Sequence, residues 1–148
     1  MYHFAIIDMS YLKNKSEINF SSAELLYQND LYPSSVHCAY YSCVQLMKYI
    51  ISDKIGINYE KQASEISQLK NQKAKRRGSH NYMIDKIEEV MLTVDKKEAN
   101  SFVGSIEDLK EFREESDYEN IDILSVKSRD SILKADLIRK QLINFFHV

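Results

Sequence analysis

The 148-residue sequence has few of the residues that interrupt regular structure: three glycines and one proline, and it contains no tryptophan. A protein built of many short strands needs many turns, and turns favour glycine and proline. Charged residues make up 28% of the chain and alternate with 44% hydrophobic ones. We therefore expect long helices joined by short loops, in one domain over residues 1–148 that buries a single core without disulfide support.

Strong charge, disulfides and membrane spans are also lacking. The net charge of −2 gives no general attraction to nucleic acid or anionic lipid, so any such binding needs a local patch. Cys38 and Cys43 are five positions apart on one predicted helix, where their side chains diverge, and two reduced thiols fit the cytoplasm. The N-terminal run with Phe4, Ile6 and Ile7 is too short for a membrane span and has no basic flank. These features predict a soluble cytoplasmic protein with no membrane contact.

The sequence contains no CxxC, HExxH or glycine-rich phosphate loop, and no carboxylate pair in an apolar setting. These patterns supply structural zinc, catalytic zinc, phosphate cradles and glycosidase or di-metal chemistry respectively. His37 lies beside Cys38 but has no second histidine at helical spacing, so we interpret it as a packed or half-exposed residue. We expect neither a metal nor a cofactor.

The central feature of the sequence is an apolar stretch over residues 32–51. Apolar side chains recur there at alternating steps of four and three, which places them on one side of a helix. Further apolar positions widen that stripe, as in a helix covered on several sides. Pro33 with Ser34 and Ser35 predicts the helix start, with a serine as the cap. The stripe consists of Val36, Tyr40, Cys43, Met47 and Ile50.

Helical periodicity also marks the segments on either side. A first amphipathic helix over about 10–28 has Tyr11, Ile18, Ser22 and Leu25 on one face, and the short turn at 29–32 predicts an antiparallel hairpin with the central helix. Residues 60–70 suit a short surface helix at best. Helices then follow from about Ser79, which we predict as its cap, to before position 93, and over about 99–116 and 126–146. The pattern predicts an all-α, up-and-down bundle of five to six helices.

The densest positive charge in the chain precedes a histidine at a predicted helix start. Such cations hold a phosphodiester while an imidazole transfers a proton near neutral pH, which suits RNA cleavage. In the competing interpretation, the histidine packs or caps the helix start and the cations form a solvated loop. The candidate catalytic residues are His80, Arg76 and Tyr82, and the candidate binding residues are Lys73, Lys75 and Arg77.

Two further sets of residues allow both a structural and a functional interpretation. Arg113 and Asp117 are four apart, so they can form an ion pair within one helix, with Tyr118 next to them; we favour this structural role over catalysis. The ten tyrosines, among them Tyr40 and Tyr41, are able to stack on bases. Most of them lie on apolar faces, where a core or interface role explains them better.

Three short blocks give the chain a resemblance to the HEPN domain family of prokaryotic toxin–antitoxin, defence and nucleotidyltransferase-associated proteins. The blocks lie in the family's order and span most of the chain. The resemblance implies an all-helical bundle that works as a homodimer, with the motifs of two subunits facing a shared cleft. The blocks are Ser22-Ala23-Glu24-Leu25-Leu26 followed by Leu31 to Ser42 with its Ala39-Tyr40-Tyr41, then Ser79-His80-Asn81-Tyr82, then Leu109 to Tyr118 with its Arg113 and Asp117-Tyr118.

Members of that family that are RNases carry an arginine a few residues before a histidine, often with a tyrosine two positions further on. His80 and Tyr82 match the second half of this motif. The positions at the family spacing hold Lys73, Ala74 and Lys75, while Arg76 and Arg77 lie too close to the histidine. Lysine neutralises a phosphate but lacks the planar fork with which arginine grips it in two places.

The resemblance leaves three functional hypotheses. The preferred one is a homodimeric domain with a degenerate RNase motif, which binds RNA, a nucleotide or a protein partner such as a cognate antitoxin or a nucleotidyltransferase. The second is a metal-independent RNase of the toxin or defence type, which uses His80 with Lys75 or Arg76. The third is a purely structural interaction bundle, in which the apolar N-terminal segment contributes to an interface.

Overall fold

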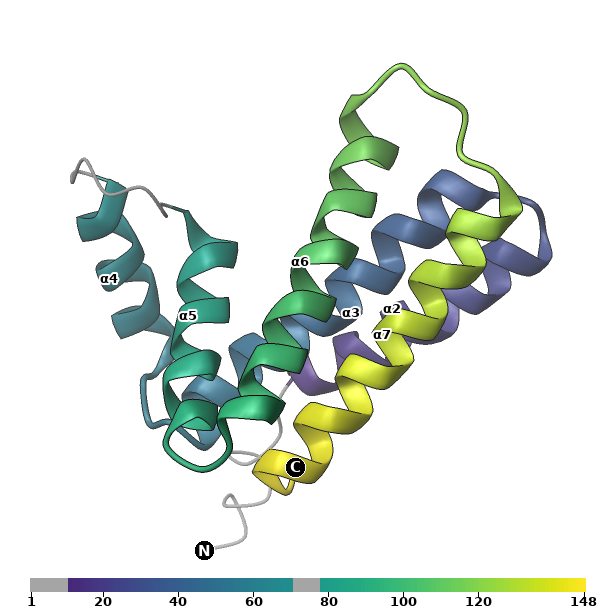
Figure 1. Ribbon diagram of the computed structural model, residues 1–148. Helices are drawn as coiled ribbons and strands as arrows, with labels where there is room; N and C mark the ends of the chain where they lie inside the picture. The colour runs from purple at the N-terminus through teal and green to yellow at the C-terminus, as the bar shows by residue number, and fades with distance from the viewer. Residues whose placement is uncertain (1–10, 71–77) are drawn as a thin grey trace, which may run out of the picture.

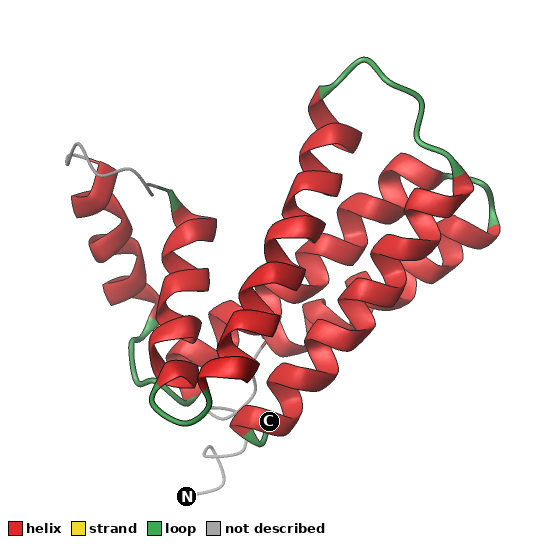
Figure 2. Ribbon diagram, in the orientation of Figure 1, coloured by secondary structure: helices red, strands yellow, loops and turns green. Residues whose placement is uncertain are grey.

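The computed structural model describes residues 11–70 and 78–148, and these ranges contain helices and connecting loops without any strand (Figure 2). This confirms the predicted all-α class. The helices are α2 (Tyr11–Gln28), α3 (Tyr32–Asp53), α4 (Tyr59–Lys70), α5 (Ser79–Leu92), α6 (Lys96–Tyr118) and α7 (Ser125–Phe146).

Helix α3 is the centre of the molecule, because α2, α5, α6 and α7 all pack against it. The five residues of its predicted stripe are fully buried, as the periodicity indicated. Helices α2 and α3 form the predicted hairpin, and α4 and α5 stand to one side of α6 (Figure 1). Helices α5 and α6 diverge from their connecting loop (Figure 1).

The predicted serine caps are wrong, because the N-cap of each helix is a residue that precedes the predicted serine. Helix α3 has Leu31 as its N-cap and Pro33 in its first turn, so Ser35 lies inside the helix, where its hydroxyl donates to the backbone carbonyl of Ala23 at 2.7 Å. Helix α5 has Gly78 as its N-cap, with φ 111° and no side chain that caps the helix. Ser79 is its first helical residue, so the amides at this helix start lack a hydroxyl cap.

The predicted face of α2 is also wrong. Tyr11, Ile18 and Leu25 are 72%, 55% and 61% exposed, and the buried residues are Ser16 and Ala23. Small side chains let two helices approach closely, and here the Ser16 hydroxyl donates to the carbonyl of Ser42 on α3 at 2.5 Å. The contact with α3 therefore uses the small, polar side of α2 and leaves its apolar side in solvent.

The remaining helices follow the sequence prediction more closely. Helix α4 forms and is anchored by the buried Gln62, whose amide donates to the carbonyl of Ile57 at 2.8 Å. Helix α6 begins three residues earlier than predicted, because the Asp95 side chain caps it by accepting from the Glu98 amide. The predicted apolar positions of α5, α6 and α7 belong to one core or pack against it.

Candidate functional site

His80 lies at the start of α5, against the aromatic side chains of α3. Its Nδ1 is 2.9 Å from the Tyr40 hydroxyl, and its ring lies 5.4 Å from the Tyr40 ring and 5.7 Å from the Tyr41 ring. Tyr40 is fully buried, while His80 is partly buried. The core of the bundle therefore fixes the orientation of this histidine.

The predicted basic partners of His80 lie outside the described residues. These are Lys73, Lys75, Arg76 and Arg77. Among the described residues, a cation that contacts the start of α5 is Lys110 of α6, whose ammonium group donates to the Asn81 side chain at 3.0 Å. Lys110 was not predicted as a site residue, because in the sequence it is one of several charged residues on the solvent-exposed face of an amphipathic helix.

A pocket of about 240 Å³ lies between the start of α5 and α6. The first helical bond of α5 runs from the Tyr82 amide to the carbonyl of Gly78 at 3.1 Å, so the Ser79 and His80 amides precede it. Amides at a helix start, together with the helix dipole, attract anions. The pocket is lined by Gly78, Ser79, His80, Asn81 and Lys110.

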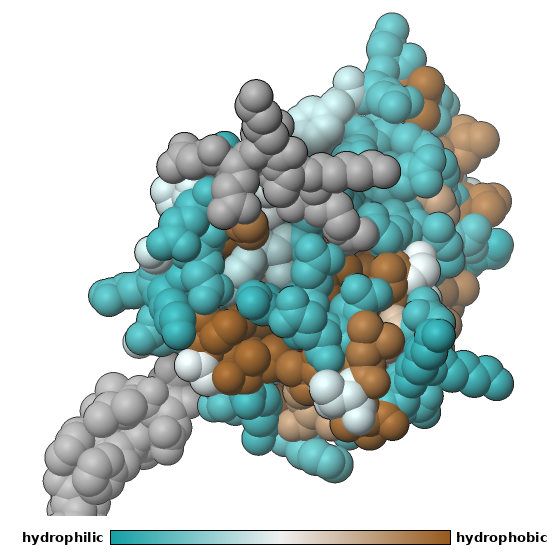
Figure 3. All heavy atoms as spheres, turned by 60° about the vertical axis from the view of Figure 1, so that its left-hand side comes forward, coloured by the Kyte–Doolittle hydropathy of each residue, from teal (hydrophilic) through white to brown (hydrophobic). Residues whose placement is uncertain are grey.

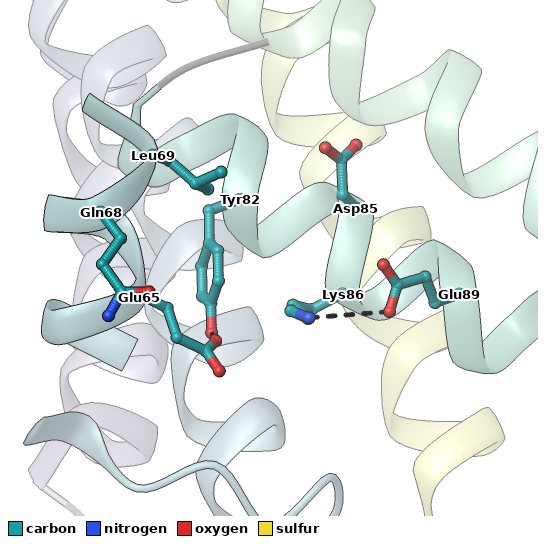
Figure 4. A pocket seen from close by; sticks show the side chains of 7 residues that line it. All are labelled: Glu65, Gln68, Leu69, Tyr82, Asp85, Lys86 and Glu89. Carbon is teal, nitrogen blue, oxygen red and sulfur yellow. Dashed lines mark hydrogen bonds and ion pairs between the residues drawn. The ribbon is translucent and has the colours of Figure 1, made fainter. Parts of the chain in front are cut away.

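The structure does not bring Tyr82 to His80. Residues two positions apart on a helix point to nearly opposite sides, and the Tyr82 hydroxyl donates to the carboxylate of Glu65 on α4 (Figure 4). Burial raises the pKa of Tyr82, and Glu65 adds to the rise. This tyrosine thus lines a separate pocket of about 360 Å³ between α4 and α5, where it is a poor proton donor to a ligand beside His80.

The centre of the site is a buried arginine that the sequence presented only as half of an ion pair. The Arg113 side chain is 7% exposed, and its Nη1 lies 3.7 Å from the Asp117 carboxylate, which confirms the predicted pair. The guanidinium group also lies over three tyrosine rings at 5.1–5.6 Å, and Nη1 donates to the Tyr118 hydroxyl at 3.1 Å. The rings are those of Tyr40, Tyr41 and Tyr118.

His37 occupies the other end of this cluster. Its Nδ1 is 2.8 Å from the Asp117 carboxylate, its ring lies 4.6 Å from that of Tyr41, and its side chain is 47% exposed. The prediction that it is half-exposed is confirmed, whereas its carboxylate partner was missed because the two residues are 80 positions apart. The cluster consists of His37, Tyr40, Tyr41, His80, Arg113, Asp117 and Tyr118. All of them lie in the three blocks that carry the family resemblance, and this was the sequence signal that could have identified them.

Burial, together with the positive charges of Arg113 and Lys110, lowers the pKa of His80 from 6.5 to about 4. His80 is therefore neutral at pH 7. We assign its tautomer from its partners: burial raises the pKa of Tyr40, so the phenol keeps its proton, and Arg113 interacts with that phenol only as a donor. The phenol proton then goes to Nδ1, which leaves the His80 ring proton on Nε2.

This lowered pKa makes the stability of the protein depend on pH. The unfolded chain takes up a proton on His80 near pH 6.5 and the folded protein only near pH 4, so this contribution is complete above pH 6.5 and is lost as the pH falls toward 4. Allowing for partial exposure, we expect wild type to lose about 1–2 kcal/mol more than His80→Gln between pH 7 and pH 4.5. Urea unfolding at both pH values measures this difference.

The matched control is His147→Asn, because His147 is exposed after the end of α7. Its stability should fall between the two pH values as much as that of wild type. The prediction would be contradicted if wild type and His80→Gln lost the same free energy of unfolding between pH 7 and pH 4.5.

Figure 3 shows hydrophilic and hydrophobic atoms on this side of the molecule, with a group of hydrophobic atoms in its lower part. Across residues 11–70 and 78–148, no three His, Cys, Asp or Glu side chains are grouped to hold a metal ion. None of the described helices is long and apolar enough to cross a bilayer. Lys110 and the first amides of α5 make the pocket at the start of this helix suited to an anionic ligand.

Comparison with known proteins gives one finding. A family model described as the HEPN domain matches residues 9–140, a range that includes every side chain of the cluster. No curated protein and no solved structure matches the chain.

Proposed function

The chain belongs to the HEPN domain family, and on that premise we propose that it is a homodimeric domain that binds RNA or a nucleotide through a phosphate at the start of α5. The family is in general one of RNases and nucleotide-related proteins. The observation that carries the proposal is the pocket in which Lys110, the His80 ring and the uncapped start of α5 come together.

The groups in this pocket match a phosphate. The Lys110 ammonium supplies charge, the Nε2 proton of His80 supplies a hydrogen bond, and the first amides of α5 supply two more donors. Residues 71–77, which follow α4 directly in the chain, contain four further cations. Their charge favours a polynucleotide over a single phosphate, because each neutralised phosphate releases counterions.

Metal-independent RNase activity is the second candidate, favoured by the presence of an imidazole in an anion pocket. General acid–base catalysis works best when the pKa of the group lies near the working pH. His80, with a pKa of about 4 and its ring proton on Nε2, is a hydrogen-bond donor at pH 7 rather than a base. We therefore prefer binding to cleavage.

The partners and the location of the protein are part of the same proposal. A second copy of the chain completes the site, and a cognate antitoxin or nucleotidyltransferase is the expected protein partner. The two cysteines are free, which fits a reducing compartment such as the cytoplasm. Sedimentation of the purified protein tests the homodimer.

Binding is tested with a fluorescent oligoribonucleotide in the presence of EDTA, read by anisotropy. We expect salt-sensitive binding that weakens strongly between about 50 and 200 mM salt, and we expect His80→Ala and Lys110→Ala each to weaken it about tenfold. Lys140→Ala is the control, because this lysine is 68% exposed on α7, and its effect should be small.

The same samples separate the alternatives. Absence of binding by wild type would contradict the proposal, and so would equal binding by all three variants. Cleavage that persists in EDTA and disappears in His80→Ala would support the RNase in its place. Circular dichroism confirms that each variant is folded.

A further inference from the structure

The site extends along α6 beyond the phosphate pocket. Lys110, Arg113 and Asp117 follow one another at steps of three and four, so they share one face of the helix. The last lies seven helical steps after the first, which is a length of about 10 Å. Lys110 lines the pocket at one end of this strip, and Asp117 holds His37 at the other. The strip is thus longer than one phosphate.

His80 and His37 lie at the two ends of this strip, and their free ring nitrogens differ: one donates a hydrogen bond and the other accepts one. An ionised carboxylate only accepts, so Nδ1 of His37 carries the proton of the hydrogen bond to Asp117. In the uncharged ring with this tautomer, which we assign from the partner, Nε2 carries a lone pair and accepts a hydrogen bond. His80 is bonded through Nδ1 to a phenol that donates, so its Nε2 carries the proton. A ligand along the strip meets a donor at one end and an acceptor at the other.

His37 is held in place before any ligand arrives. Asp117 fixes its Nδ1 and the Tyr41 ring fixes its plane, while Nε2 has no hydrogen-bonding partner among the described residues. The ring of His80 also contacts Tyr41, so one tyrosine side chain separates the two imidazoles. Groups fixed in this way bind without losing further side-chain freedom.

We propose that His37 is a specificity-determining residue of the proposed site: its Nε2 accepts a hydrogen bond from the 2′-hydroxyl of the ribose whose phosphate lies at the start of α5. This inference rests on the proposed function. A second phosphate is a poor fit at this end, because it has no proton to donate and Asp117 repels it. The 2′-hydroxyl is a neutral donor attached to the same nucleotide, and it distinguishes RNA from DNA.

The test measures anisotropy with three oligonucleotides of one uracil-only sequence that carry 2′-hydroxyl, 2′-hydrogen or 2′-fluoro sugars. The 2′-fluoro sugar keeps the conformation of ribose but cannot donate. One hydrogen bond corresponds to about tenfold in affinity, so wild type should bind the ribose oligomer about tenfold more tightly than either of the others. His37→Phe keeps a ring against Tyr41 and removes both nitrogens, so this ratio should fall to about one while binding of the 2′-hydrogen oligomer stays unchanged.

The control is His80→Ala, which should weaken all three oligomers equally and preserve the ratio. Equal binding of the three by wild type, or an unchanged ratio in His37→Phe, would overturn the inference and leave the proposed function standing. The inference would also be overturned if wild type preferred the ribose oligomer only in sequences with other bases, because His37 would then contact a base. Failure of all three to bind would overturn the proposed function, and this inference with it.

Discussion

Replacing Arg113 with alanine is expected to lower the free energy of unfolding by about 3 kcal/mol. The side chain is 7% exposed and pairs with Asp117, which is itself only 19% exposed. Its removal leaves that carboxylate with His37 as its remaining partner among the described residues, and it removes the cation that lies over three tyrosine rings. The loss therefore combines an uncompensated charge with lost packing.

Urea unfolding of Arg113→Ala and wild type at pH 7 measures this effect. The matched control is Arg129→Ala, because Arg129 is exposed on α7, and its stability should change by less than about 0.5 kcal/mol. Arg113→Lys should recover part of the loss, since lysine keeps the charge but not the planar group that stacks on the rings. A change below about 0.5 kcal/mol in Arg113→Ala would show that the cluster does not support the fold.

Ala23→Leu is expected to destabilise the protein by about 2–3 kcal/mol, the second large effect. Ala23 is fully buried between α2 and α3, and its backbone carbonyl accepts from the Ser35 hydroxyl. A leucine there forces the helices apart and strains this bond. It also strains the bond from Ser16 to Ser42 on the same side of α2.

Thermal and urea unfolding measure this second effect. The control is Glu24→Leu, which places the same side chain at the neighbouring exposed position and should change stability by less than about 0.5 kcal/mol. If both leucine variants were equally stable, α2 would not pack on α3 through its small side.

Most of the fold was predictable because the deciding signal is local. In α3 the apolar stripe alternates in steps of four and three, and all five of its members are fully buried. The short turn after α2 correctly predicted the hairpin. The predicted helix starts were wrong by a few residues. A serine near a helix start can cap its own helix, but it can equally bond a neighbouring helix, as Ser35 does.

The site was predictable only in part. His80 was identified from the cations before it, yet its described partners come from α3 and α6. Tyr82 was assigned to the same site by its spacing, and the structure directs it to Glu65. His37 was set aside for want of partners nearby in the sequence, although Asp117 lies 2.8 Å away.

The sequence by itself determined that this chain is helical, where most of its helices lie and to which family it belongs, because helix periodicity and short motifs are properties of neighbouring residues. The tertiary structure decided which side of α2 is buried and which polar side chains meet. Tyr40 and His80 are 40 positions apart, and His37 and Asp117 are 80 apart. Such contacts depend on how far each helix is rotated about its axis when it packs, and no local pattern fixes that rotation.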